Sequence, residues 1–205
     1  KSLTEISPAQ RDSIMKVTGW PRIQMKDGRI VKDDPAIYID FNALAKGYTV
    51  DLVANYLTGL GSENHLVEIG GEVVAKGISP TSGALWKIGI DNPQQGQERS
   101  LQAVLSLDNQ ALATSGNYRK YRVDEKTGQK YVHSINPLNG KPVRSNVLSA
   151  SVKAPDCMTA DAYATSLMVM PFERGKALIE ADPSLSAYWI LAKGAETEEI
   201  ASSRW

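Results

Sequence analysis

The middle of the sequence consists of short apolar segments with no helical repeat between them. Glycine, proline or asparagine separates these segments, a pattern that indicates strands joined by turns. The predicted strands are residues 65–69, 72–76, 86–91, 101–107, 118–123, 131–135 and 147–154. Apolar residues at helical spacing flank them, at 8–18 and 43–60 on one side and at 156–170 and 172–181 on the other. Because consecutive strands are bracketed by helices instead of alternating with them, the sequence predicts an α+β domain.

Shorter elements complete this prediction. A hairpin is expected at 22–31, because Asp27 and Gly28 tolerate the positive φ of a tight turn. Further strands are expected at 36–41 and 187–192. Tyr188 and Trp189 lie in the last of these strands, and we expect them, together with Trp86, to belong to the core rather than to a ligand platform.

Composition excludes several classes of protein. The 205 residues include 23 Lys and Arg and 23 Asp and Glu, so the formal net charge is zero and nucleic acid is not an expected partner. No apolar stretch approaches the roughly 18–20 residues that a membrane-spanning helix needs. The single Cys157 excludes an internal disulfide framework and a thiolate metal cluster, and we expect it to be buried.

Asp161 and Thr165 stand four residues apart in the predicted helix 156–170. This spacing places a carboxylate and a hydroxyl on one helix face, and both groups are oxygen donors of the kind that Mg²⁺ accepts. A purely structural interpretation is also available, in which Asp161 complements the first turn of its helix and Thr165 bonds to its own backbone. Spacing alone leaves both interpretations open.

Asp40 ends the predicted strand 36–41, and Lys46 follows near the start of the predicted helix 43–60. A helix start offers free N–H groups and a positive dipole end, which together with Lys46 suit a phosphate group. Alternatively, Asp40 or Asn42 is an ordinary N-cap and Lys46 is a solvated side chain.

Three loop segments combine glycine or proline with polar residues. Gly70 and Gly71 interrupt two apolar strands, which indicates a bulge, a tight turn or a backbone approached closely by a ligand. The small polar segment 113–118 is expected to be a loop whose N–H groups could face an anion, although such loops are also common without a function. His133 stands at a predicted strand end beside the turn 137–142, and is a candidate proton carrier or polar ligand contact.

Five segments, taken in order along the chain, resemble the ApbE family of FAD:protein FMN transferases. They are DFNALAKGY (40–48), VEIGGE (67–72), ATSGNYR (113–119), HSINPLNGKP (133–142) and ADAYAT (160–165). Asn136 differs from the family pattern, which usually has Asp at this position. Members of the family also carry a further N-terminal third that supplies part of the FAD site. We therefore expect residues 1–205 to form a single ApbE-type domain that lacks this portion.

The resemblance implies a fold, an activity and a set of site residues. The fold would be the α+β, T-fold-related arrangement of an antiparallel sheet packed with helices. The activity would be Mg²⁺-dependent transfer of the FMN half of FAD to a threonine hydroxyl of a target protein, with release of AMP. By matching position, the metal would be bound by the side chains of Asp161 and Thr165 and the backbone carbonyl of Ala43. The expected FAD site consists of Asp40, Lys46, Gly70, Gly71, Glu72, Ser115, Gly116, Asn117, His133 and Ile135.

Within that site, we expect Asp161 and His133 to act in catalysis. His133 would deprotonate the incoming threonine or orient the phosphate. Two other functions remain open: an FAD pyrophosphatase, in which water replaces the threonine and the products are FMN and AMP, and a flavin-binding module without turnover. The family resemblance also implies FAD and a target flavoprotein as partners. The expected location is the periplasmic side of the bacterial inner membrane, reached through a lipid anchor that is not part of this sequence.

Overall fold

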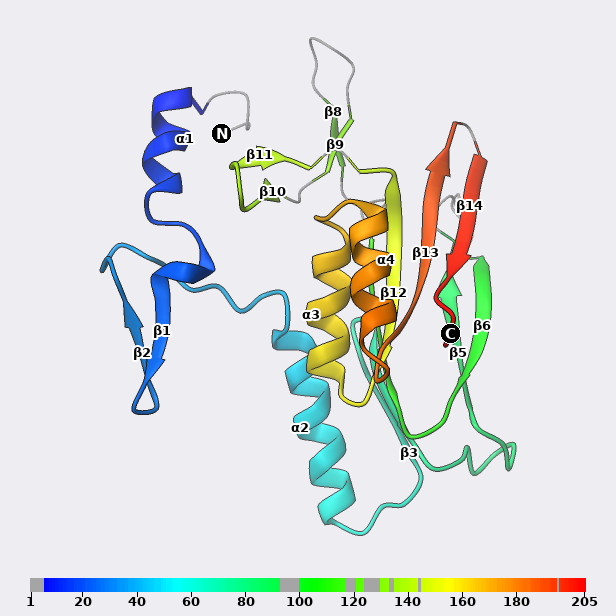
Figure 1. Ribbon diagram of the computed structural model, residues 1–205. Coiled ribbons are helices and arrows are strands. Elements are labelled where there is room, and N and C mark those ends of the chain that lie inside the picture. The colour runs from blue at the N-terminus through cyan, green and yellow to red at the C-terminus, as the bar shows by residue number, and fades with distance from the viewer. Residues whose placement is uncertain are drawn as a thin grey trace.

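A six-stranded antiparallel sheet forms the centre of the molecule in the computed structural model (Figure 1). The structure describes residues 6–92, 100–116, 121–123, 130–132, 135–143, 145–194 and 196–205. The strand order in the sheet is β14-β13-β12-β7-β4-β3. These strands are β3 (His65–Ile69), β4 (Glu72–Lys76), β7 (Ala111–Gly116), β12 (Val147–Ala154), β13 (Ser186–Lys193) and β14 (Glu196–Ala201).

Three helices cover one face of this sheet: α2 (Ala45–Gly59), α3 (Cys157–Leu167) and α4 (Phe172–Ala181) (Figure 1). The core between α3 and the sheet is built from small side chains, with Ala160 and Ala164 of the helix in the same buried cluster as Ala113 and Ala150 of the strands. Small side chains on both surfaces let the helix approach the sheet closely. This approach brings the polar residues of α3 within reach of β7.

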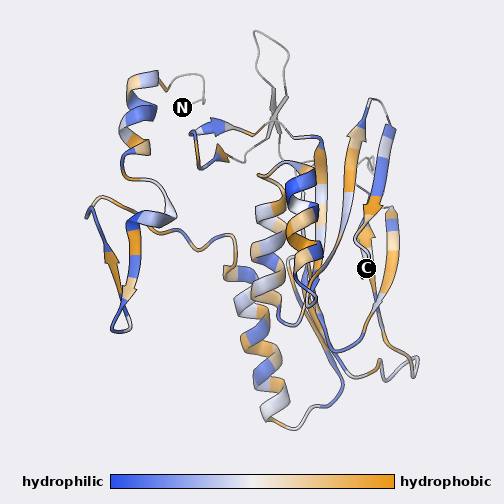
Figure 2. Ribbon diagram, in the orientation of Figure 1, coloured by the Kyte–Doolittle hydropathy of each residue, from blue (hydrophilic) through white to orange (hydrophobic). Residues whose placement is uncertain are grey.

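The other face of the sheet packs against the hairpin of β5 (Trp86–Asp91) and β6 (Leu101–Leu107). Leu112 of β7 contributes to this second core together with Leu107 of β6. Strand β13 is buried along most of its length, and Figure 2 shows it as mainly hydrophobic. Trp189 and Tyr188 are buried and Trp86 is partly buried, so their predicted place in the core is confirmed.

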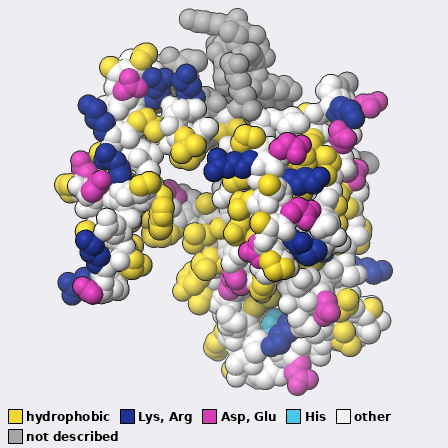
Figure 3. Space-filling view, in the orientation of Figure 1, with side chains coloured by type: hydrophobic (Ala, Val, Ile, Leu, Met, Phe, Trp, Pro, Cys, Tyr) yellow, Lys and Arg dark blue, Asp and Glu magenta, His cyan; other side chains and the backbone are white. Residues whose placement is uncertain are grey.

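The N-terminal residues form a separate layer beside the helices (Figure 1). It contains α1 (Pro8–Met15), the 3₁₀ helix η2 (Trp20–Arg22) and the hairpin of β1 (Ile23–Lys26) and β2 (Arg29–Lys32). None of these elements has a buried residue, and Trp20 is 81% exposed; Figure 3 shows hydrophobic side chains on the surface of this layer. The side chain of Met15 in α1 lies against Gly140.

Two short antiparallel pairs lie between β7 and β12 in the sequence. They are β8 (Tyr121–Val123) with β9 (Lys130–Val132), and β10 (Ile135–Asn136) with β11 (Lys141–Pro142). Gly140, in the turn that joins β10 to β11, has a φ of 63°. This second pair therefore contacts α1 through its turn while its strands lead back toward the sheet.

Most of the predicted elements are confirmed, with shifted ends. The hairpin at 22–31 turns through Asp27 and Gly28, whose φ values are 49° and 69°. The expected strands at 118–123 and 131–135 correspond to β8, β9 and the start of β10, although residues 117–120 and 133–134 lie outside the described part of the chain. Among the described residues, no helix is long and apolar enough to span a membrane.

Two predictions of local structure were wrong, and one strand was not predicted at all. Residues 36–41 form no strand, because Asp40 instead closes a side-chain turn by accepting the N–H of Asn42 at 2.7 Å. The segment expected to be a loop at 113–118 begins as strand β7 in the middle of the sheet, where small side chains are needed under α3. Strand β14 was not predicted, because its Glu residues lack the apolar alternation of a half-buried strand.

Candidate active site

Asp161 is the buried carboxylate around which the site is arranged. It lies in the second turn of α3 and is 3% exposed. Its Oδ2 accepts the backbone N–H of Gly47, in the first turn of α2, over 3.0 Å. Burial raises the pKa of Asp161, while the Gly47 N–H and the charge of Lys46 act in the opposite direction. Asp161 therefore complements the positive end of a helix, but the helix is α2 and not its own.

The contact between α2 and α3 is reciprocal. One turn after Gly47, Asp51 of α2 accepts the N–H groups of Cys157 and Met158, both over 2.8 Å, at the start of α3. Asp156, the residue directly before α3, is the N-cap of this helix and accepts the N–H of Thr159. Each helix thus supplies a carboxylate to the first turn of the other, which fixes where Asp161 sits.

The absence of a side chain at Gly47 permits this contact. A Cβ added there would lie 2.2 Å from the carbonyl oxygen of Cys157. Such a separation is far inside van der Waals contact, so any larger residue would push the helices apart. Cys157 is buried as expected, and burial raises the pKa of its thiol.

Lys46 and Glu72 add a second charged pair beside Asp161. Lys46 Nζ lies 2.6 Å from Glu72 Oε2, with the lysine side chain 52% exposed and the glutamate 2% exposed. Burial raises the pKa of Glu72; the bond from Lys46 lowers it and the charge of Asp161 raises it further. The negative charges of Asp161 and Glu72 therefore lie close enough to interact, with Lys46 between them and solvent.

The glycine pair at 70–71 forms a tight turn between β3 and β4 next to this lysine. Gly70 and Gly71 have φ values of 64° and 104°, which favour glycine. A Cβ at Gly70 would lie 3.8 Å from both Lys46 Cδ and Glu72 Oε2. The turn thus forms one side of the cluster.

Thr165 contacts the sheet one turn further along α3. Its Oγ1 lies 3.2 Å from the hydroxyl oxygen of Ser115, in β7. In the purely structural interpretation, the Thr165 hydroxyl would bond to the backbone of its own helix. The structure shows such a bond for the neighbouring Ser166 instead, whose hydroxyl donates to the carbonyl of Ala162. Gly116 ends β7 opposite Ser149.

The remaining expected site residues are exposed or lie outside the described part of the chain. Ala43 is exposed in the turn before α2, and Asp40 is exposed and bonded to Asn42. Ile135 is partly exposed at the start of β10. Within the described ranges, Asp40 and Ile135 make no hydrogen bond or ion pair with the cluster around Asp161. His133 and Asn117 lie outside the described residues.

The comparisons with known proteins agree with these elements. The sequence model of the ApbE family matches residues 2–189. The chain belongs to the ApbE family. It is 43% identical over 166 residues to an FAD:protein FMN transferase of Vibrio cholerae, covering 81% of this chain and 48% of the relative. It is 31% identical over 192 residues to an FAD:protein FMN transferase of Escherichia coli K12, covering 92% of this chain and 53% of the relative.

Solved structures of ApbE proteins share the fold. The flavin transferase ApbE of Vibrio cholerae superposes with a TM-score of 0.85 at 37% identity, covering 97% of this chain and 61% of that one. The flavinyl transferase ApbE of Pseudomonas stutzeri gives a TM-score of 0.83 at 31% identity, covering 97% and 60%. The α+β, ApbE-like fold predicted from the sequence is therefore confirmed. The chain spans about half the length of the curated ApbE relatives it matches.

Two residues with clear roles in this ApbE site had been given none by the sequence. Gly47 and Asp51 both lie in or next to the first of the five matching segments. Both residues act on α3, which lies more than a hundred positions further along the chain. The signal in the sequence is that position 47 is a glycine, which allows another helix to pack closely against α2.

Proposed function

We propose that this chain transfers the FMN half of FAD to a threonine hydroxyl of a target protein, with Mg²⁺ bound and AMP released. Family membership supports flavin transfer in general, because the curated relatives are FAD:protein FMN transferases. The observation that carries the proposal is the burial of Asp161 against the first turn of α2, with Thr165 on the same helix and Lys46 beside it.

The donor set around Asp161 fits a magnesium ion. Asp161 uses Oδ2 for Gly47, and no described residue donates a hydrogen bond to its Oδ1. The carbonyl of Ala43 precedes α2, and no hydrogen bond to it is found among the described residues. Ala43, Asp161 and Thr165 thus offer a carbonyl, a carboxylate and a hydroxyl, which are hard oxygen donors that suit Mg²⁺.

The described residues offer less to zinc than to a hard cation. In the part of the chain that the structure describes, no three His, Cys, Asp or Glu side chains form a group that could hold a metal ion. Such a group would be expected for zinc. When bound, Mg²⁺ would offset the negative charge that builds on the pyrophosphate and on the leaving AMP.

Charge balance also favours a cation at this site. Asp161 and Glu72 would repel a pyrophosphate, and Lys46 alone offsets only one of the two charges. The start of α2 adds positive potential from its first turn. We infer that the dinucleotide is bound with a divalent cation, with Lys46 leaving Glu72 to donate to a phosphate oxygen.

The proposed reaction is a displacement at the phosphorus of the FMN half. The threonine oxygen forms a bond to this phosphorus while the bridging P–O bond to AMP breaks. AMP leaves with the bridging oxygen, and the threonine proton passes to a base. We propose His133 for that base, and an unchanged transfer rate in His133→Ala would remove it from the mechanism.

Location is part of the same proposal. We place the protein on the periplasmic side of the bacterial inner membrane, held by a lipid anchor, on the basis of the family resemblance. Fractionation of cells that express the protein from its natural gene would test this, and recovery in the cytoplasm would contradict it.

The reaction is tested by incubating the chain with FAD, Mg²⁺ and short synthetic peptides that each carry one threonine. The proposal predicts a covalent FMN adduct on the threonine and an equal amount of AMP, both abolished by EDTA. Free FMN with unmodified peptide would support the pyrophosphatase instead. Binding of FAD without any product would support a flavin-binding module.

A further inference from the structure

A cavity of about 730 Å³ lies between the β10–β11 segment and the connection from α3 to α4. One wall is apolar and includes Val169, Met170 and Phe172. The opposite wall is polar and includes Asn136, Asn139 and Lys141. No Asp or Glu occurs among the described residues that line the cavity.

The cavity begins one helical turn beyond the candidate metal site. Val169 follows Thr165 by four residues, and its N–H still bonds to the carbonyl of Ser166 in a continuing turn. The polar wall starts with Asn136, next to Ile135, the last expected member of the FAD site. A molecule in the cavity would therefore lie next to the candidate metal site, on the side of Thr165.

The polar wall contains several hydrogen-bond donors. The side-chain oxygens of Asn136 and Asn139 already accept the N–H groups of Leu138 and Lys141, each over 2.9 Å, so their NH₂ groups remain as donors. Lys141 adds an exposed ammonium group. Such a wall is complementary to carbonyl oxygens.

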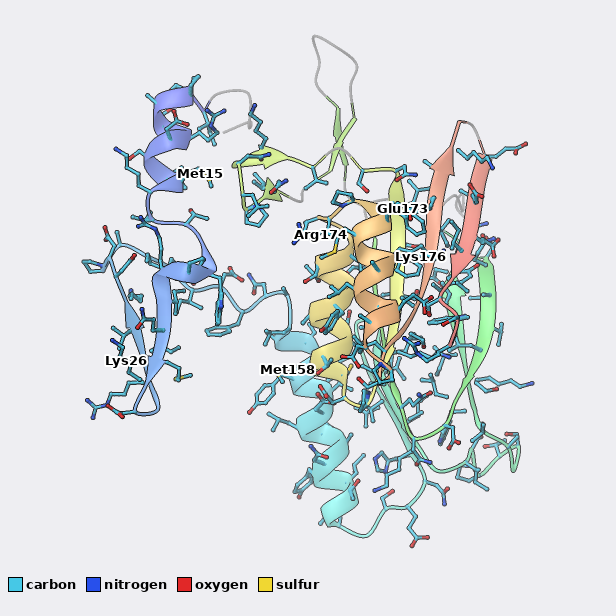
Figure 4. The ribbon with its side chains drawn as sticks, viewed as in Figure 1. Met15, Lys26, Met158, Glu173, Arg174 and Lys176 are labelled. Carbon is cyan, nitrogen blue, oxygen red and sulfur yellow. The ribbon has the colours of Figure 1, made fainter. Side chains whose placement is uncertain are left out.

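Two charged residues of opposite sign, Glu173 and Arg174, follow the cavity-lining residue Phe172 at the start of α4. Figure 4 shows Arg174 at the start of α4, on the side of β10 and β11, with Glu173 next to it in sequence. Among the described residues that line the cavity itself, the charged side chain is that of Lys141.

The walls suit a polypeptide better than a second part of the dinucleotide. In the described lining, the aromatic surface for a flavin or adenine ring is limited to Phe172, which also makes a T-shaped contact with Trp189 at a centroid distance of 5.4 Å. An extended peptide places carbonyl oxygens along its backbone and side chains to either side. Among the described strands, β10 and β11 pair only with each other, so their outer edges are open to an added strand.

We propose that this cavity binds the segment of the target protein that carries the acceptor threonine. Its carbonyl oxygens lie on the donors of the 136–141 wall, and an apolar side chain lies against Val169 and Met170. The acceptor hydroxyl then enters the site past Thr165. This inference rests on the proposed transferase function.

The test compares two cavity variants with matched controls in the transfer assay. Val143→Trp fills the cavity, and Val104→Trp places the same side chain on the exposed surface of β6. Lys141→Glu reverses the charge of the polar wall, and Lys87→Glu does so on an exposed position of β5. Initial rates are measured against the concentration of the best threonine peptide and, separately, of FAD.

We expect both cavity variants to raise the KM for the peptide by about tenfold or more, with the KM for FAD within about twofold of wild type. The control variants should leave both constants unchanged. A raised KM for FAD with an unchanged KM for peptide would overturn the inference, because the cavity would then belong to the dinucleotide site. Unchanged constants in both cavity variants would also overturn it. A wild-type chain that modifies no peptide would instead reject the proposed function and the inference with it.

Discussion

The N–H of Gly47 in α2 donates to Oδ2 of Asp161 in α3, although 114 positions separate the two residues. This single bond joins the start of the helix that carries Lys46 to the helix that carries Thr165. The proposed metal ligands are therefore held by the packing of two helices rather than by a loop.

Gly47→Ala should separate these helices. Its Cβ would lie 2.2 Å from the carbonyl oxygen of Cys157, so we expect a loss of about 2–3 kcal/mol in the free energy of unfolding. Gly59→Ala is the matched control, because nothing lies within 4 Å of a Cβ there. The control should be neutral or about 0.5–1 kcal/mol more stable. Urea unfolding measures both, and equal midpoints would contradict the close-contact argument.

Asp51→Ala should weaken the start of α3. The variant loses the acceptor of two N–H groups, those of Cys157 and Met158, and we expect it to destabilise the fold by about 2 kcal/mol. Asp51→Asn keeps one side-chain oxygen and should lose less. Asp12→Ala, on the exposed surface of α1, should stay within about 0.5 kcal/mol of wild type. Thermal unfolding should rank the variants in this order, and an Asp51→Ala variant as stable as Asp12→Ala would rule out the reciprocal capping.

Glu72 should make stability depend on pH. Its pKa is raised in the fold, chiefly by burial, above the ordinary value of 4.5. At pH values between the ordinary pKa and the raised pKa of the folded state, the folded chain binds more protons than the unfolded chain. The free energy of unfolding therefore falls as the pH rises through this window. The stabilisation from protonated Glu72 is fully present below pH 4.5. Glu72→Gln removes it, and the advantage of this variant over wild type should grow as the pH is raised from 4.5 toward neutrality.

The comparison uses urea unfolding without added metal at a series of pH values. Glu196→Gln, at an exposed position of β14, serves as the control and should follow the wild-type curve. A difference between Glu72→Gln and wild type that stays constant with pH would show that burial does not raise this pKa.

The hydroxyl of Thr165 should matter for metal binding and not for packing. Thr165→Val keeps the shape of the side chain but removes the oxygen, and we expect the Mg²⁺ concentration for half-maximal transfer to rise by about tenfold or more. Thr165→Ser should remain close to wild type. Ser115→Ala removes only the partner hydroxyl in β7 and should have a smaller effect. If Thr165→Val needed no more Mg²⁺ than Ser115→Ala, Thr165 would not be a ligand.

The sequence could predict those parts of the fold that follow from local patterns. Turn residues located the β1–β2 hairpin, and apolar runs located most strands of the sheet. The segment 113–116 was taken for a loop because its small, polar residues lack strand character. Only the closeness of Ala160 and Ala164 explains why small residues occur in a central strand. Strand propensity depends on such neighbours more than on the residue itself.

The candidate site shows the same limit. The resemblance to the ApbE family pointed to Lys46, Glu72, Asp161 and Thr165. The structure brings the first three together through the Lys46–Glu72 ion pair and the interaction of their charges with Asp161, and Thr165 lies one turn beyond Asp161 on α3. The resemblance could not indicate that Lys46 is paired with Glu72, or that Gly47 is the partner of Asp161. These are contacts between elements far apart in sequence, and no periodicity encodes them.

The most direct test of the account is Mg²⁺-dependent flavin transfer by Asp161→Asn. Asparagine keeps an oxygen that can accept the Gly47 N–H, so the fold should be retained, as circular dichroism would show, while the negative charge on the metal is lost. We predict that covalent transfer of FMN to a threonine peptide falls by about a hundredfold or more and is not restored by excess Mg²⁺. Wild-type rates with the wild-type dependence on Mg²⁺ would contradict the assignment of Asp161 as the central ligand.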